Sequence, residues 1–182
     1  MKNVYERGFN QTTLADIAEY ATVPLGNVYY YFRTKEALGK ALVDERTSSY
    51  RALRATWDNL PNPKARLFAF IQMTVDHIDL LVQHGCPIGS LCQELSKNGD
   101  GFKKEAANIF AEFLVWLEAQ FCDLIKDGKS FNHAIQLLAA LQGATLLSHS
   151  LNDTIYIVRE TARLKRWINQ VSAVKKKMRD RT

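Results

Sequence analysis

The sequence predicts an all-α fold, on three observations. Apolar residues recur every three or four positions in nearly every segment longer than ten residues, which is the period of a helix with one buried face. The strict alternation typical of half-buried strands does not occur. Only four prolines and nine glycines interrupt the sequence. We therefore expect helices joined by short turns.

Composition narrows the class of protein. The 182 residues are 47% hydrophobic and 24% charged, which is typical of a folded globular chain with one sizeable core or two small ones. No apolar run approaches the roughly 18 residues of a membrane span, and the start MKNVYERG lacks the apolar core of a signal peptide. We expect a cytoplasmic protein with no membrane partner. Residues 159–182 carry nine Lys/Arg and two Asp/Glu, so the excess behind the net charge of +5 lies in this tail. We interpret the tail first as a solvated helix end and only second as a DNA-binding arm, so the net charge does not by itself indicate nucleic-acid binding.

Patterns expected of an enzyme or a metal site do not occur. The four histidines form neither HExxH nor a ligand cluster, and no phosphate-binding glycine loop is present. Cys86, Cys92 and Cys122 are an odd number without CxxC spacing, which argues against a disulfide framework and a zinc finger. We expect no catalytic residue, metal or cofactor.

Three short helices are predicted close to the N-terminus. Thr13 precedes an amphipathic stripe over residues 14–21, and Asp16 stands where a capping-box acid would lie. Pro24 suits the first turn of a second helix, and Thr34 can cap a third. Two short helices joined by a tight turn form a helix-turn-helix, whose second helix enters the major groove of DNA.

The second of these helices carries four consecutive aromatic residues, YYYF at 29–32. A helix turns by about 100° per residue, so four neighbours cannot share one buried face. Some of these rings must face solvent or a partner. The run therefore indicates a binding surface.

The residues quoted so far resemble the TetR/AcrR family of bacterial repressors. The shared features are Thr13, Ile17-Ala18, Val23, Gly26, Tyr29, Phe32 and the TKEAL start of the third helix at 34–38. Farther along, HGCPIGSLCQEL resembles a Gly-Cys-Pro-x-Gly-x-Leu motif of one branch of the family.

The resemblance implies a two-part architecture. An N-terminal helix-turn-helix DNA-binding domain would occupy residues 1–46, and a C-terminal helical ligand-binding and dimerisation domain residues 47–182. Only MKNVYERGF precedes the predicted second helix, so we expect most of the first helix to be missing. The alternatives are a misassigned start, for which we expect additional residues upstream, and a domain that is genuinely trimmed. The implied function is a homodimeric repressor that binds palindromic double-stranded operator DNA and is released by a small hydrophobic or aromatic effector.

The resemblance also assigns site residues. In the family, the positions of Tyr29 and Phe32 are largely structural, with Phe32 packed inward, whereas those of Tyr30 and Tyr31 face the duplex. Lys35 matches a phosphate-binding lysine. Where many relatives have a Ser-Lys pair, this chain has Pro24-Leu25. We therefore expect recognition of the DNA sequence to depend on apolar contact by Leu25. The implied DNA-binding residues are Thr13, Leu25, Gly26, Asn27, Tyr30, Tyr31 and Lys35.

The C-terminal domain is predicted to hold helices at about 63–84, 87–95, 102–126, 132–150 and 154–174. In the family, the effector pocket lies among the long helices of this domain. Each residue that we assign to the pocket has an alternative interpretation as an ordinary core residue. The ligand-binding candidates are Met73, His77, Leu91, Phe113, Trp116, Leu117 and Gln142.

A dimer interface is predicted on the last two helices. One carries a small-residue face and the other an apolar stripe, and the alternative is an internal core face. The residues concerned are Ala140, Gly143, Ala144 and Leu147, together with Ile155, Val158, Ala162 and Trp167.

A thiol sensor is the alternative to a ligand sensor. Cys86 directly precedes Pro87, and a cysteine at a helix N-terminus is stabilised as the thiolate. The competing interpretation of Cys86 is a small buried residue at a helix start.

Overall fold

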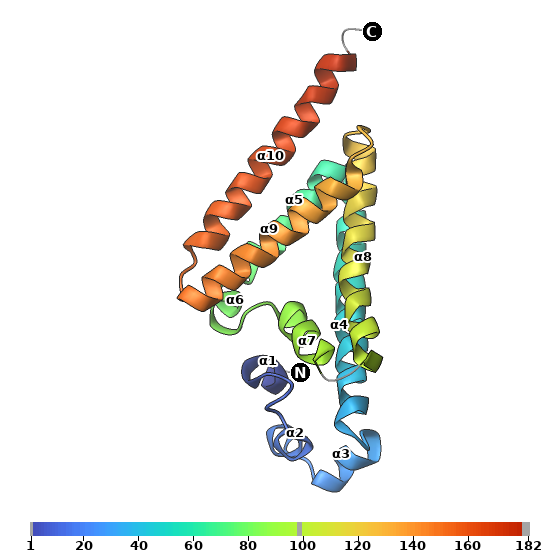
Figure 1. Cartoon of the computed structure of the whole chain (residues 1–182), viewed down its shortest axis with the longest axis vertical. Helices are drawn as coiled ribbons and strands as arrows, with labels where there is room; N and C mark the ends of the chain where they lie inside the picture. The colour runs from blue at the N-terminus through green and yellow to red at the C-terminus, as the bar shows by residue number, and fades with distance from the viewer. Residues whose placement is uncertain (1, 98–99, 180–182) are drawn as a thin grey trace. The chain divides into compact units, whose positions relative to one another are not determined.

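The computed structural model describes residues 2–97 and 100–179, and every regular element in those ranges is an α-helix (Figure 1). The predicted all-α fold is confirmed. The helices are α1 (Lys2–Arg7), α2 (Leu14–Ala21), α3 (Leu25–Tyr31), α4 (Lys35–Asp58), α5 (Pro63–Asp76), α6 (Ile78–His84), α7 (Pro87–Ser96), α8 (Asp100–Leu124), α9 (Ser130–Leu151) and α10 (Ile155–Arg179).

The chain forms two compact units. Unit 1 comprises Met1–Ala52 and Pro87–Phe110, and unit 2 comprises Leu53–Cys86 and Ala111–Thr182. Unit 1 thus holds α1, α2, α3, α7 and the first parts of α4 and α8. Because α7 is distant in sequence from the helix-turn-helix but belongs to the same unit, nonlocal packing is part of the unit 1 fold.

Side-chain caps set the helix starts in unit 1. Thr13 is the N-cap of α2, with the reciprocal bonds to Asp16 of a capping box. The Thr34 hydroxyl accepts the Ala37 N–H at 3.1 Å and caps α4. α2 ends at Thr22, whose φ of 56° is left-handed. The predicted starts of α2 and α4 are therefore confirmed.

Gly39 on α4 permits close packing in the unit 1 core. A Cβ at this position would lie 3.0 Å from Cζ of Phe9 and 3.3 Å from Cδ2 of Leu95. Both side chains are buried, so glycine lets the loop after α1 and the end of α7 meet on α4. Other buried apolar residues of this unit are Val4, Ala18, Val28, Leu38, Leu42, Val43, Tyr50, Leu91 and Ile109.

In unit 2, the single helix predicted at 63–84 is wrong, because it is divided at His77. The His77 N–H bonds to the carbonyl of Val75, and the imidazole Nδ1 lies 2.9 Å from the Met73 carbonyl that a continuous helix would use. The side chain thus replaces the helical backbone bond, without a proline or glycine to indicate it. The cap of α5 follows the prediction, with Pro63 in the first turn and Asn62 accepting the Ala65 N–H.

The core of unit 2 lies around α9. This helix packs against α6 and α10, and α10 also contacts α5. α9 is long and apolar enough to cross a membrane by length and composition alone, but the core helices of globular proteins can have the same length and composition. Its buried residues are Ser130, Ala134, Leu137, Leu138, Leu141, Ala144, Thr145 and Ser148.

Candidate nucleic-acid interface

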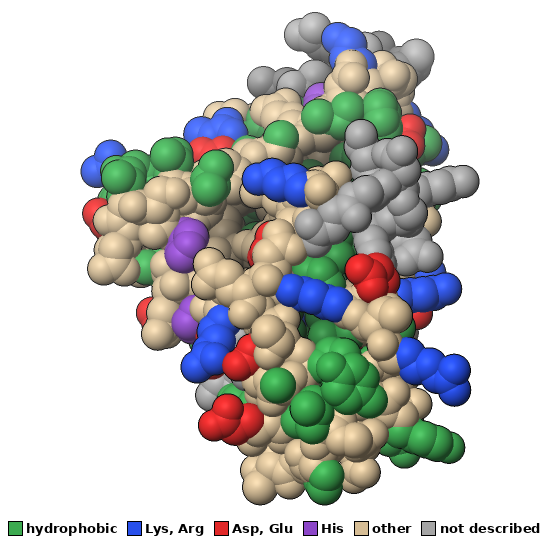
Figure 2. All heavy atoms as spheres, turned by 60° about the horizontal axis from the view of Figure 1, so that its bottom comes forward, with side chains coloured by type: hydrophobic (Ala, Val, Ile, Leu, Met, Phe, Trp, Pro, Cys, Tyr) green, Lys and Arg blue, Asp and Glu red, His purple; other side chains and the backbone are tan. Residues whose placement is uncertain are grey.

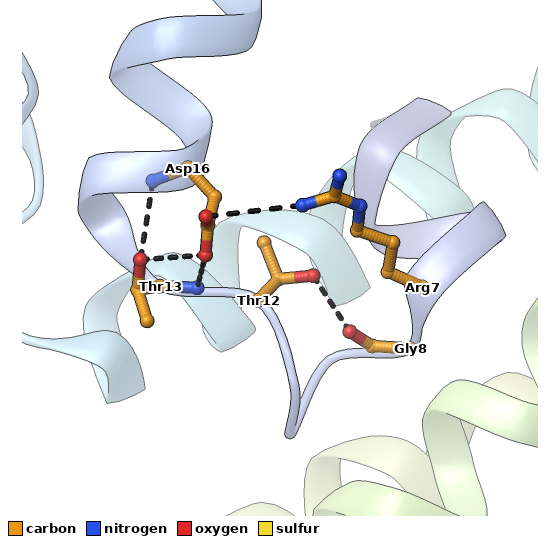
Figure 3. A network of polar contacts seen from close by, with 5 residues as sticks. All are labelled: Arg7, Gly8, Thr12, Thr13 and Asp16. Carbon is orange, nitrogen blue, oxygen red and sulfur yellow. Dashed lines mark hydrogen bonds and ion pairs between the residues drawn. The ribbon is translucent and has the colours of Figure 1, made fainter.

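A network of polar contacts fixes the start of α2 (Figure 3). The Thr13 backbone N–H and hydroxyl both donate to Oδ2 of Asp16, at 2.7 and 2.6 Å, and the Asp16 N–H donates back to the Thr13 hydroxyl at 3.1 Å. Arg7 lies 3.8 Å from the other carboxylate oxygen. Just before the cap, the buried Thr12 hydroxyl donates to the Gly8 carbonyl at 2.7 Å. The first helix of the pair is therefore well anchored.

The same network lowers the pKa of the Asp16 carboxyl. The main cause is the hydrogen bond from the Thr13 side chain, followed by the bond from the Thr13 backbone. The carboxylate form also suits the first turn of a helix, where the backbone dipole favours negative charge. Asp16 therefore stays ionised at neutral pH and keeps α2 capped.

The second helix, α3, is held by backbone and apolar contacts. Its N-cap, Pro24, makes no side-chain cap bond. Val28 is its one buried residue within the described part of the chain, and α3 packs against α2. The sequence analysis did not identify Val28. Its spacing of three residues from Leu25 and four from Phe32 is the helical period and could have predicted its burial.

The exposed surface of α3 is aromatic. Tyr29, Tyr30 and Tyr31 are 50%, 80% and 75% exposed, and the rings of Tyr30 and Tyr31 meet edge to face at 5.2 Å. Figure 2, with the bottom of Figure 1 turned forward, shows hydrophobic side chains at the surface among lysine and arginine side chains. Phe32 follows α3 as its C-cap and is only half-buried, which is less than the inward packing we expected.

α3 can contact DNA with neutral groups. Its sequence, LGNVYYY, contains no ionisable side chain other than the phenols. A phenolic O–H donates to phosphate oxygens, and its ring can lie against sugar or a thymine methyl. The exposed Asn27 amide can bond an adenine edge. Nothing lies within 4 Å of a Cβ built on Gly26, so this end of the helix is open.

Lys35 is engaged within unit 1. Its Nζ donates to the Asn10 carbonyl at 2.7 Å and lies 5.1 Å from the centroid of the Phe9 ring. An ammonium group has three donors, so two remain for a phosphate. Lys35 is half-buried.

The predicted DNA-binding residues all belong to unit 1. The structure places six at the surface and Lys35 half-buried. The Thr13 hydroxyl is occupied by the capping box. The exposed members are Thr13, Leu25, Gly26, Asn27, Tyr30 and Tyr31.

The predicted ligand-binding residues are spread over both units. Leu91 is buried in unit 1, and the other six lie in unit 2. His77 is exposed, whereas Met73 and Gln142 are half-buried. Phe113, Trp116 and Leu117 are buried in unit 2.

Phe113 and Trp116 belong to an aromatic cluster in unit 2. Phe70 contacts both of them, with ring centroids 5.9 and 6.0 Å away, and Trp57 packs against Phe70 and Trp116. The indole N–H of Trp116 donates to Asp58 at 2.8 Å. These rings therefore pack on one another.

A small hollow lies within unit 1. It offers about 30 Å³, which is room for only a few water molecules. Its lining comes from α1 and the following loop, α4 and α7. The lining residues are Val4, Tyr5, Gly8, Phe9, Leu42, Arg46, Pro87, Ser90, Leu91 and Glu94.

An apolar surface covers parts of α9 and α10 in unit 2. Gly143 is exposed, with open space where a Cβ would lie. Two residues of the predicted interface pack inward instead: Ala144 joins a buried cluster with Ile157, and Trp167 contacts Phe121. The exposed large apolar residues of this surface are Leu146, Leu147, Leu151, Ile155 and Val158.

None of the three cysteines, which all lie in the described ranges, forms a disulfide. Cys86 and Cys92 are half-buried, and Cys122 is exposed. Cys86 precedes Pro87, the first residue of the ten-residue helix α7. Among the described residues, no three His, Cys, Asp or Glu side chains are grouped closely enough to hold a metal ion.

Sequence comparison matches residues 2–42 to the model of bacterial regulatory proteins of the tetR family. An uncharacterised HTH-type transcriptional regulator of Lactococcus lactis is 26% identical over 157 residues, which are 82% of this chain and 79% of that protein. The transcriptional repressor NemR of Escherichia coli is 33% identical over 93 residues, which are 50% of this chain. This match spans 45% of NemR, about half of its length.

Solved structures share the fold. A TetR transcriptional regulator from Legionella pneumophila superimposes with a TM-score of 0.80 at 19% identity, over 93% of this chain and 90% of that one. The reduced form of E. coli NemR gives a TM-score of 0.75 at 21% identity, over 91% and 90%. The family model covers the N-terminal helices, and the solved structures share the fold of the chain.

Proposed function

We propose that this chain, as a TetR-family regulator, is a cytoplasmic repressor that binds palindromic operator DNA as a homodimer and is released by a small molecule. The observation that carries the proposal is α3, a short helix that exposes Leu25, Asn27, Tyr30 and Tyr31 beside the capped helix α2. The match of residues 2–42 to the family model supports it. NemR, which matches over half of this chain, is named as a repressor.

DNA contact would combine positioning and readout. Tyr30, Tyr31 and Lys35 are assigned to the phosphate backbone, which fixes the register of the helix on the duplex. Leu25 and Asn27 are assigned to base edges. Because α3 itself has no cation, charge attraction would come from residues around it, such as the exposed Arg33.

Dimerisation would use the exposed apolar surface of α9 and α10. The large side chains of this surface lose contact with water if a second copy covers it, and the open space at Gly143 allows a helix to approach closely. A two-fold partner supplies the second reader that a palindrome requires.

The dimer surface is tested with Leu147→Asp, because Leu147 is exposed and a charge there changes little in the monomer. We expect the mass in solution to fall from dimer to monomer by light scattering, and operator affinity to fall by at least tenfold. Gln170→Asp, which adds the same single charge at an exposed site farther along α10, is the matched control. An unchanged dimer in Leu147→Asp would contradict the assignment.

The effector would be small and hydrophobic or aromatic, and would bind in unit 2. The support is the concentration of aromatic residues on α5 and α8, together with the half-buried Met73 of α5 and Gln142 of α9 in the same unit. Opening a site there requires the packed rings to separate, so the bound form would differ from this structure. Thermal-shift screening of hydrophobic compounds would identify a ligand, which should also release the DNA.

Fluorescence anisotropy with DNA from upstream of the gene tests the central proposal. We expect binding at least a hundredfold tighter than to a random duplex at moderate salt. Equal affinity for the two duplexes would reject operator recognition.

Thiol sensing by Cys86 is the second candidate. It is favoured by the half-exposed position of Cys86 at the start of α7, and by the existence of a structure of NemR described as its reduced form. We expect Cys86→Ser to leave effector-driven release intact. Loss of operator binding on mild peroxide treatment, abolished in Cys86→Ser, would make thiol sensing the better account.

A further inference from the structure

The segment 87–110 connects the two units through the chain. It belongs to unit 1, but the residues before it, up to Cys86, and after it, from Ala111, belong to unit 2. Its first helix is α7. A contact between α7 and the helix-turn-helix is therefore a contact between the DNA reader and a segment tied to unit 2 at both ends.

Glu94 of α7 contacts the loop that leads into α2. Its Oε2 accepts the backbone N–H of Asn10 at 2.6 Å, across 84 positions of sequence. Its other oxygen lies against Gly8, where a Cβ would be 3.1 Å away. Gly8 also has a φ of +87°, which favours glycine. Glycine at position 8 therefore serves both the loop conformation and the approach of the carboxylate.

Lys35 holds the same residue from α4. While Glu94 accepts the N–H of Asn10, the Lys35 ammonium donates to the Asn10 carbonyl at 2.7 Å. The two polar backbone groups of Asn10 thus bond to side chains of opposite charge. Hydrogen bonds to ionised groups are shorter and stronger than neutral ones. We call this arrangement of Glu94, Asn10 and Lys35 the loop clamp.

The clamp lies just before the DNA-reading helices. Two residues after Asn10, the fully buried Thr12 bonds back to Gly8, and Thr13 then caps α2. α3 in turn packs on α2. The clamp therefore holds the loop that leads into the Thr13 cap, from which α2 and α3 follow along the chain.

We propose that Glu94 is a positioning residue for operator binding, which acts through the loop clamp and ties the placement of α2 and α3 to the placement of α7. The inference rests on the proposed function. The competing interpretation is a bond that contributes only to the stability of unit 1. The two are distinguished by a variant that retains an acceptor and by separate measurement of specific and nonspecific DNA binding.

The clamp itself is tested without DNA. In ¹H–¹⁵N spectra of the full chain, Glu94→Ala should shift the Asn10 amide upfield and increase its hydrogen exchange at least tenfold. Glu94→Gln keeps a carbonyl acceptor and should give smaller changes. Gln93→Ala, at the exposed neighbouring position, is the matched control and should leave the Asn10 signal unchanged. An Asn10 amide indifferent to Glu94→Ala would overturn the clamp.

Operator binding tests the positioning role. The probe is a duplex selected by the parent protein from a random library. We expect Glu94→Ala to bind this duplex about tenfold more weakly, because it removes a charge-assisted bond. Glu94→Gln keeps a neutral acceptor and should bind within about threefold of the parent. Affinity for random duplex and the salt dependence should not change, since no phosphate contact is removed.

Two results would overturn the inference. In the first, Glu94→Ala binds the selected duplex as the parent does. In the second, it loses affinity for selected and random duplexes equally, together with thermal stability. The second pattern is that of a purely structural bond. If the parent itself does not discriminate between duplexes, the proposed function fails and the inference falls with it, whatever the Asn10 spectra show.

Discussion

The aromatic side chains of α3 in unit 1 and those of the cluster on α5 and α8 in unit 2 are used in opposite ways. In unit 1, Tyr30 and Tyr31 of α3 are 80% and 75% exposed, and their rings contact each other. In unit 2, Phe70, Phe113 and Trp116 are buried against one another. Tyrosine tolerates exposure because its hydroxyl remains hydrated, whereas phenylalanine has only apolar surface to hide. The buried rings of unit 2 therefore stabilise the fold, whereas the exposed tyrosines of α3 are available for binding.

The difference also follows from the helices that carry the rings. α3 has seven residues and one buried anchor, Val28, so most of its surface faces outward. The rings of unit 2 lie on longer helices, with 14 residues in α5 and 25 in α8, and these helices can bury a whole face. A short helix with a single anchor is suited to present side chains to a partner.

The largest effect is expected in the buried cluster. Phe70→Ala removes a ring that is 2% exposed and contacts Trp57, Phe113 and Trp116. We expect the free energy of unfolding to fall by about 3–5 kcal/mol, because the loss of burial is joined by a cavity. Urea denaturation followed by tryptophan fluorescence measures it. A loss below about 1 kcal/mol would show that the cluster is not a stabilising core.

The opposite result is expected for the exposed ring. Tyr30→Ala should change the free energy of unfolding by less than about 0.5 kcal/mol, because little surface is buried. It should weaken operator binding by about tenfold, through loss of contact with the duplex. Denaturation and anisotropy on the same sample would measure both. Normal DNA binding in Tyr30→Ala would remove this ring from the interface.

A smaller effect is expected at the cap of α2. Thr13→Ala removes the hydroxyl that accepts the Asp16 N–H and should cost about 1 kcal/mol of stability. Amide exchange in α2 should quicken more than in α4, which keeps its own Thr34 cap. Uniform protection of both helices after Thr13→Ala would contradict the assigned cap.

The pH dependence of this cap has a definite sign. The hydrogen bonds from Thr13 hold the folded pKa of Asp16 below its ordinary value. The cap therefore stabilises fully above the unfolded pKa, and its contribution is lost as the pH falls through the lower, folded pKa. Thr13→Ala should remove this part of the acid sensitivity, which thermal melts at decreasing acidic pH would detect. An equally steep acid loss in the variant would show that Asp16 is not the cause.

The sequence predicted features that depend on near neighbours. The caps at Thr13 and Thr34 rest on residues within three positions, and the exposure of the tyrosine run follows from the helical period. These are local signals, and they were sufficient to locate the candidate DNA-reading helix.

Two kinds of feature were not predicted: contacts between distant segments, and a side chain that bonds to a backbone carbonyl of its own helix. The bond from Asn10 to Glu94 spans 84 positions, and no periodicity in either segment indicates it. The helix is divided at His77 because the imidazole bonds to the backbone carbonyl of Met73. A histidine in a helical pattern does not usually indicate such a break. The inward packing of Ala144 depends on which side of α9 is covered by α10, and composition alone does not decide that.

Selection of duplexes from a random library by the parent protein tests the central claim most directly. If α3 reads base edges in a two-fold dimer, successive rounds should enrich one sequence with two symmetric half-sites, bound at least about a thousandfold more tightly than the starting library. A library that remains random in sequence, with the same affinity after selection as before, would contradict sequence-specific recognition by this helix.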